Sequence, residues 1–139
     1  MVFETTGAAE AFLLARILFG GVLAFMGVNH FLNVEQMSGY AEMKGLPAPG
    51  FGVVASGVLL VAGGLAIIVG AFPVLAAGAL ALFLLASAVL FHNFWAVPED
   101  QQQDEMTSFL KNTVMTGGAL VFFALGGAAW PYALGVTIV

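Results

Sequence analysis

Residues 11–32 read AFLLARILFGGVLAFMGVNHFL, an apolar run interrupted by one arginine and closed by an asparagine and a histidine. At the helical rise of about 1.5 Å per residue, this stretch makes a helix of about 33 Å, which is long enough to cross the hydrocarbon core of a bilayer. Residues spaced three or four apart share one stripe of that helix: Arg16, Gly20, Leu23, Gly27 and His30. Because glycines let a second helix approach closely, we expect this stripe to face another helix.

Further apolar runs lie at residues 50–70, 73–97 and 108–129. The chain is 61% hydrophobic and 8% charged, which leaves too little polar surface to cover a soluble core. We therefore predict an all-α membrane protein in which residues 1–139 form one domain, a bundle of four transmembrane helices. The expected location is the cytoplasmic membrane of a prokaryote, with several membrane passes.

The connector between the first two runs, residues 33–49, breaks the apolar pattern with charged and polar side chains. Within it, Val34, Met37 and Tyr40 are spaced as on one face of a helix. We expect a short helix lying in the membrane interface, ended by Gly45 and the prolines that follow. A plain polar loop is the alternative.

Charge and cysteine content exclude several classes of function. The chain has no cysteine, so it forms neither disulfides nor cysteine-based metal or iron–sulfur sites. Its basic residues are three, Arg16, Lys44 and Lys111, against eight acidic ones. Because no polybasic cluster exists, nucleic acid is not an expected partner.

Short connections make the four expected helices alternate in direction. The first and third helices then end on the side where the second and fourth begin. Polar residues at that face are the candidates for ligand binding: Asn29, His30, His92, Asn93, Lys111 and Asn112. Arg16 lies toward the opposite face.

The two histidines, His30 and His92, allow several kinds of chemistry. Side chains on facing helices build cofactor sites in bundles, so the pair could bind a b-type haem axially. They could also hydrogen-bond a quinone headgroup or relay a proton. A metal site is not expected, since no third ligand of the usual kind is forced onto their face. The structural alternative is that each histidine, with its adjacent asparagine, only caps interhelical hydrogen bonds.

Arg16 is a charged residue inside an apolar helix, where insertion costs up to about 2.5 to 3.5 kcal/mol. It lies about five residues from the helix start, so we expect its side chain to extend to the lipid headgroups. Other partners open to it are Glu10, the C-terminal carboxylate of Val139, backbone carbonyls and a bound anion or quinone carbonyl.

Several segments in order resemble the DoxX family of small four-helix membrane proteins. They are Arg16, Gly27-Val28-Asn29-His30-Phe31, Gly39-Tyr40, Lys44-Gly45-Leu46-Pro47, Gly63-Gly64, His92-Asn93-Phe94-Trp95 and Phe109-Leu110-Lys111-Asn112. The resemblance spans about residues 11–130 and implies a link to quinone-dependent oxidase and thiosulfate-oxidising systems. Many members carry a glutamate shortly before the glycine pair, where this chain has Leu59-Leu60-Val61-Ala62. Arg16 therefore needs a partner other than that carboxylate.

From the residues and the resemblance together we expect a small membrane subunit of a quinone-linked redox assembly. A quinone or similar apolar ligand would bind near His30 and His92, and a partner protein would supply electrons. If the protein takes part in catalysis, it does so as an accessory subunit of an oxidoreductase. The lipid bilayer is an expected partner, and a second copy of the chain is an alternative to the redox protein. The other interpretations are a non-catalytic scaffold or lipid-binding protein, and a bis-histidine haem b protein.

Overall fold

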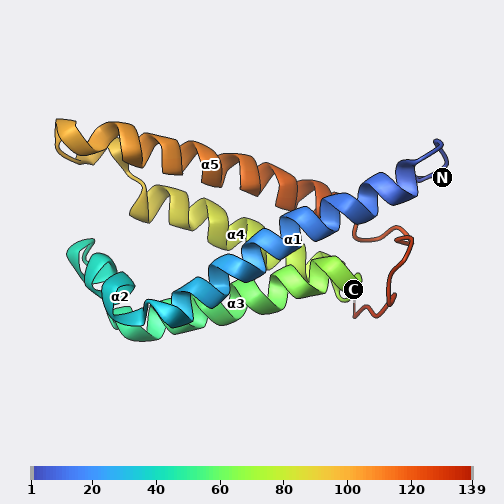
Figure 1. Ribbon diagram of the computed structural model, residues 1–139, viewed down its shortest axis with the longest axis horizontal. Coiled ribbons are helices and arrows are strands. Elements are labelled where there is room, and N and C mark those ends of the chain that lie inside the picture. Colours follow the sequence, from blue (N-terminus) through green and yellow to red (C-terminus); the bar gives the residue numbers. More distant parts are fainter. Residues whose placement is uncertain (1, 139) are drawn as a thin grey trace.

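The computed structural model describes residues 2–138, which fold into α-helices and short connections (Figure 1). In chain order the elements are α1 (Ala8–Leu32), α2 (Val34–Met43), α3 (Pro49–Val69), α4 (Pro73–Phe91), the 3-10 helix η1 (Phe94–Ala96) and α5 (Glu99–Ala124). Both α3 and α4 begin on a proline, which has no N–H to leave unbonded in the first turn. The turn between them uses Gly70 at φ 69°, a conformation that glycine adopts without strain.

The long helices pack as two antiparallel pairs, α1 with α3 and α4 with α5. Figure 1 shows the pairs close together at the end where α1 begins and spread apart at the end that carries α2. Within the first pair, a Cβ atom added to Gly27 would lie 2.7 Å from the Gly57 carbonyl oxygen. The predicted glycine stripe of the first helix therefore does face another helix, and that helix is α3.

The core lies where the two pairs meet. Its fully buried large side chains are Arg16, Leu23, Leu60, Ile67, Leu80 and Leu84. At the end where α1 begins, an aromatic cluster closes the core, with Phe12 in contact with Phe122 and Trp130 at ring-centroid distances of 5.6 Å and 5.0 Å. The charged Arg16 is thus part of the core, which the apolar pattern alone does not predict.

Three helical segments of the described chain are, by length and composition, able to cross a membrane: Ala8–Leu32, Pro49–Val69 and Pro73–Ala96. The protein is accordingly a multi-pass membrane protein. The fourth crossing, at 108–129, stays a prediction, and its helix is shorter than expected because α5 ends at Ala124. Two contacts turn the chain at this point. Gly126 packs against Val74, so that a Cβ atom added to Gly126 would lie 2.5 Å from a Val74 methyl carbon. In addition, Trp130 Nε1 donates a hydrogen bond to the Leu125 carbonyl at 2.8 Å.

Two other expectations concern the ends of the third span and the connector. The apolar pattern predicts a third span that is helical to residue 97, but α4 ends at Phe91 and the chain turns through His92 and Asn93. His92 contacts Glu105 and Asn93 accepts a hydrogen bond from Lys44, and a helix that continued through these two residues would break both contacts. The short helix expected in residues 33–49 is present as α2, and its position at a membrane interface stays a prediction.

Candidate ligand site

A cavity of about 890 Å³ lies between the helix pairs at the end where they spread. Residues of α1, α2, α3, α4 and α5 all contribute to its wall. His30 lines it from the last turn of α1, and His92 lines it from the end of α4. The two histidines that are far apart in the sequence thus share one hollow, with apolar side chains such as Leu60 and Phe83 between them and the core.

His30 is fixed by hydrogen bonds to α3. Its Nδ1 lies 2.9 Å from the Ser56 hydroxyl oxygen and 3.2 Å from the Val53 carbonyl oxygen. The Ser56 hydroxyl in turn donates to the same Val53 carbonyl at 2.9 Å. These contacts orient the imidazole through one nitrogen and leave the other, Nε2, outside this network.

His92 is held by a carboxylate from α5. Its Nδ1 lies 3.1 Å from Glu105 Oε2, and the side chains of the two residues are 25% and 17% exposed. The Tyr40 hydroxyl lies 3.0 Å from Glu105 Oε1 and 2.7 Å from the Phe91 carbonyl oxygen. Burial raises the pKa of Tyr40, and the hydrogen bond and negative charge of Glu105 raise it further, so the phenol stays protonated.

Helix α2 lines one side of the cavity, and two residues at its end, Tyr40 and the C-cap Lys44, connect it to the second helix pair and to the turn after α4. Tyr40 makes the bonds just described, and Lys44 donates from Nζ to Asn93 Oδ1 at 2.7 Å. Lys44 Nζ also lies 5.5 Å from the centre of the Tyr40 ring. The Asn93 side chain is therefore engaged by the α2 end and does not line the cavity.

The remaining predicted residues divide into those at the cavity and those away from it. Asn29 is exposed at the rim and accepts from Asn33 Nδ2 at 2.8 Å, while the buried Asn112 donates to the Leu84 carbonyl at 3.3 Å. Lys111 is exposed on α5 and is not part of the cavity wall. The structure therefore brings together four of the predicted residues, Asn29, His30, His92 and Asn112.

Arg16 lies at the other end of the bundle and is fully buried, at 0% exposure. Its guanidinium donates to four backbone carbonyls, those of Ile67, Ile68, Pro131 and Tyr132, at 3.1, 2.6, 2.6 and 2.9 Å. The expectation that it extends to lipid headgroups is wrong, because the last turn of α3 and the C-terminal segment surround it. Of the alternative partners, backbone carbonyls are the ones observed, and Val139 lies outside the described residues.

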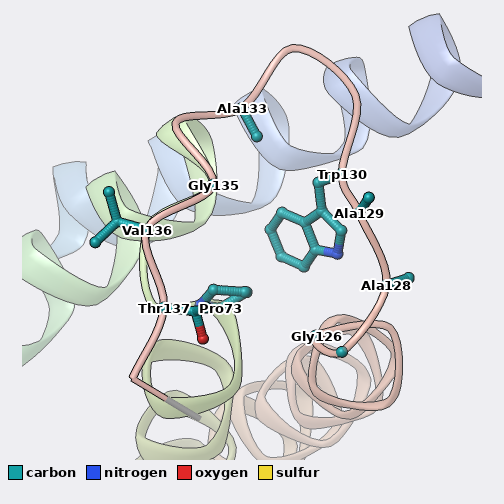
Figure 2. A pocket seen from close by; sticks show the side chains of 11 residues that line it. Pro73, Gly126, Ala128, Ala129, Trp130, Ala133, Gly135, Val136 and Thr137 are labelled. Atoms are coloured by element: carbon teal, nitrogen blue, oxygen red, sulfur yellow. The ribbon is translucent and has the colours of Figure 1, made fainter.

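A second hollow, of about 330 Å³, lies beside Arg16 under the C-terminal segment (Figure 2). Figure 2 shows the Trp130 ring inside the arch that this segment makes over Pro73 and the end of α5. Its wall is built from small residues and backbone, and no described titratable side chain lines it. This second cavity can hold a ligand by its shape, but its described wall has no side chain for acid–base chemistry.

The sequence reasoning did not single out four residues that complete the candidate site: Tyr40, Lys44, Ser56 and Glu105. The sequence marks Tyr40 by its helical spacing and by the family resemblance, neither of which assigns it to the site, and it marks Glu105 only as one acid of the charged residues 99–105. Their partners are distant in sequence, 65 residues apart for Tyr40 and Glu105. Within the described chain no group of three or more histidine and acidic side chains is placed to hold a metal ion.

Comparison with known protein families finds a match. A family model described as DoxX matches residues 11–93, which is more than half of the chain and includes both histidines. No curated protein and no solved structure matches.

Proposed function

Since this chain belongs to the DoxX family, we propose that it is the small membrane subunit of a quinone-linked redox assembly in a prokaryotic cytoplasmic membrane. In this proposal the cavity between the helix pairs holds the headgroup of a quinone. The chain has no cysteine, so electrons come from a redox centre of a partner protein. The observation that carries the proposal is that His30 and His92, from different helix pairs, line one cavity.

The cavity suits a flat apolar ring that carries two oxygen atoms. Its volume of about 890 Å³ lies within the usual range of about 300 to 1,000 Å³ for small-molecule sites. Aliphatic and aromatic side chains supply most of the wall, and a few polar groups supply orientation, as such sites require. A bound quinone would supply two-electron, two-proton redox chemistry.

The residues of the chain would position the headgroup and handle protons. His30 and His92 each keep one ring nitrogen outside the protein's own hydrogen bonds, so both can bond to a headgroup oxygen. Glu105 holds the His92 ring and is itself partly exposed. The His92–Glu105 pair thus places two groups that can carry a proton side by side at the edge of the cavity.

A non-catalytic scaffold or lipid-binding protein is the second candidate. It is favoured by Arg16 and Asn93, whose side chains bond within the protein and fix its elements together. The third candidate, a haem b protein, uses the same two histidines as axial ligands. An absorption spectrum of the purified protein separates the third from the others, because only a haem protein shows a Soret band.

Filling the cavity tests the proposal. Gly52 lines the cavity, and a Cβ atom added to it would have nothing within 4 Å, so Gly52→Phe narrows the cavity without a backbone clash. Gly117 on α5 is equally open but lies away from the cavity, and Gly117→Phe is the matched control. We expect quinone extracted from the purified protein to fall in Gly52→Phe and to stay at the wild-type level in Gly117→Phe. Equal quinone content in wild type and both variants would favour the scaffold.

A further inference from the structure

The hydrogen bonds around His30 determine which of its nitrogens carries the proton. The Val53 carbonyl can only accept, and the Ser56 hydroxyl uses its single proton on that same carbonyl. Both groups near His30 Nδ1 therefore act as acceptors toward it, so Nδ1 is the protonated nitrogen. In the neutral ring Nε2 is then a lone-pair acceptor.

The same reasoning holds for His92. Its Nδ1 faces the Glu105 carboxylate at 3.1 Å, and an ionised carboxylate only accepts hydrogen bonds. The other carboxylate oxygen already faces the Tyr40 hydroxyl, which fixes the carboxylate in place. His92 in its neutral form thus also keeps Nε2 as an acceptor.

Both Nε2 atoms are accessible to a ligand. No described residue hydrogen-bonds to either atom. Neither atom is among the fully buried side-chain atoms without a partner, so both are at least partly exposed. The Tyr40 hydroxyl and the Asn33 amide are bonded within the protein, and Asn112 uses one of the two N–H groups of its side-chain amide. Asn29 and Gln36 lie at the exposed rim, and the Ser87 hydroxyl can donate or accept. The inner wall of the cavity thus offers two imidazole nitrogens as acceptors, one from each helix pair, beside the second N–H of Asn112 and the Ser87 hydroxyl.

We propose that this cavity binds the reduced hydroquinone form of its ligand in preference to the oxidised quinone. This inference rests on the proposed function and specifies which redox form the site takes. A hydroquinone carries two O–H donors, and each can donate to one Nε2. A quinone carries two carbonyl acceptors, which find no donor on either neutral ring and lose their hydrogen bonds to water on binding.

The size of the preference follows from the number of hydrogen bonds. A hydrogen bond contributes about 0.5 to 1.5 kcal/mol net, and 1.4 kcal/mol is a factor of about ten in affinity. One bond to each histidine gives a preference of about fivefold to a hundredfold for the hydroquinone. By linkage, each tenfold preference raises the two-electron midpoint potential of the bound couple by about 30 mV, which favours electron flow from the partner to the quinone.

Calorimetric titration of the purified full chain in detergent tests the inference with three probes of one ring system. The probes are a short-chain benzoquinone, its hydroquinone kept reduced under argon, and the dimethyl ether of that hydroquinone, which cannot donate. All three titrations are run at pH 8. We expect the hydroquinone to bind at least about fivefold more tightly than either other probe.

Variants assign that preference to the histidines. We expect His30→Leu and His92→Leu each to lower hydroquinone affinity by about tenfold while the affinity of the dimethyl ether stays within about twofold. Lys111→Met, at an exposed position outside the cavity wall, should leave the preference unchanged. If the quinone binds as tightly as the hydroquinone or more tightly, this inference is wrong and the proposed function stands. If no probe binds, both are wrong. The comparison of probes on the wild-type protein needs no variant, so it holds even where a histidine variant fails to fold.

Discussion

Replacing Arg16 by methionine should detach the C-terminal segment from the helix bundle. Arg16 donates to carbonyls of two parts of the chain, the end of α3 and residues 131–132. Methionine fills most of the same space but leaves four carbonyls without their donor. It also removes the cation–π contacts of the guanidinium with the Phe12 and Trp130 rings, at 5.8 Å and 5.5 Å.

The cost can be worked out from these contacts. Hydrogen bonds from a charged donor contribute about 1.5 to 3 kcal/mol each when buried. Only the bond to Ile67 is fully buried, and the carbonyls of Pro131 and Tyr132 can regain water, so their share is discounted. We expect a loss of about 3 to 5 kcal/mol in the free energy of unfolding, the usual cost of removing one partner from a buried charged network.

Two measurements check this expectation in detergent. Equilibrium unfolding gives the free energy, and hydrogen exchange of residues 132–136 reports whether the C-terminal segment opens first. The control is Lys111→Met, which removes one positive charge from an exposed position on α5. If Arg16→Met and Lys111→Met lose equal stability, or if exchange at 132–136 is unchanged in Arg16→Met, the assigned role of Arg16 is refuted.

Three other outcomes are expected. In the folded protein the pKa of Tyr40 is above the ordinary value of about 10, so above that pH the unfolded chain loses its phenol proton first and the free energy of unfolding falls. Tyr40→Phe should therefore reduce the fall in melting temperature between pH 9 and pH 11. An unchanged dependence of melting temperature on pH would contradict the assigned environment. Gly27→Ala should destabilise the protein by about 1 to 3 kcal/mol, because the new Cβ atom clashes with the backbone of α3. The control is Gly21→Ala, whose Cβ atom has nothing within 4 Å, and in the same thermal scan it should be neutral or slightly stabilising. Lys44→Met should increase hydrogen exchange in α2 by removing its bond to Asn93, and equal exchange in the two proteins would show that this bond does not hold the helix.

Sequence periodicity predicted the parts of the fold that depend on local physics. Apolar runs of spanning length, the short helix within residues 33–49 and the glycine stripe on α1 all follow from interactions within a few residues or from repeated small side chains. Alternation of helix direction was then enough to bring His30 and His92 to one end of the bundle. The pair of histidines in one cavity is thus the part of the site that a sequence can indicate.

The partners of the polar residues could not be predicted in this way. Arg16 bonds to carbonyls 51 to 116 residues away, and every backbone carbonyl looks the same in a sequence. Glu105 was one acid among several in a charged segment, and only the turn after α4 brings it to His92. The shortened ends of α4 and α5 have the same origin, since contacts between distant segments stop both helices before their apolar pattern ends.

Nitrogen-15 NMR of histidine-labelled protein reads the proton positions on both imidazoles, because the chain has only two histidines and the spectrum contains only two rings. We expect both rings to be protonated at Nδ1. Adding the hydroquinone probe should shift both Nε2 resonances, while adding its dimethyl ether should shift neither, and His30→Leu assigns the two rings. A ring protonated at Nε2, or Nε2 resonances that do not respond to the hydroquinone, would show that the two histidines do not hold the hydroquinone in this way.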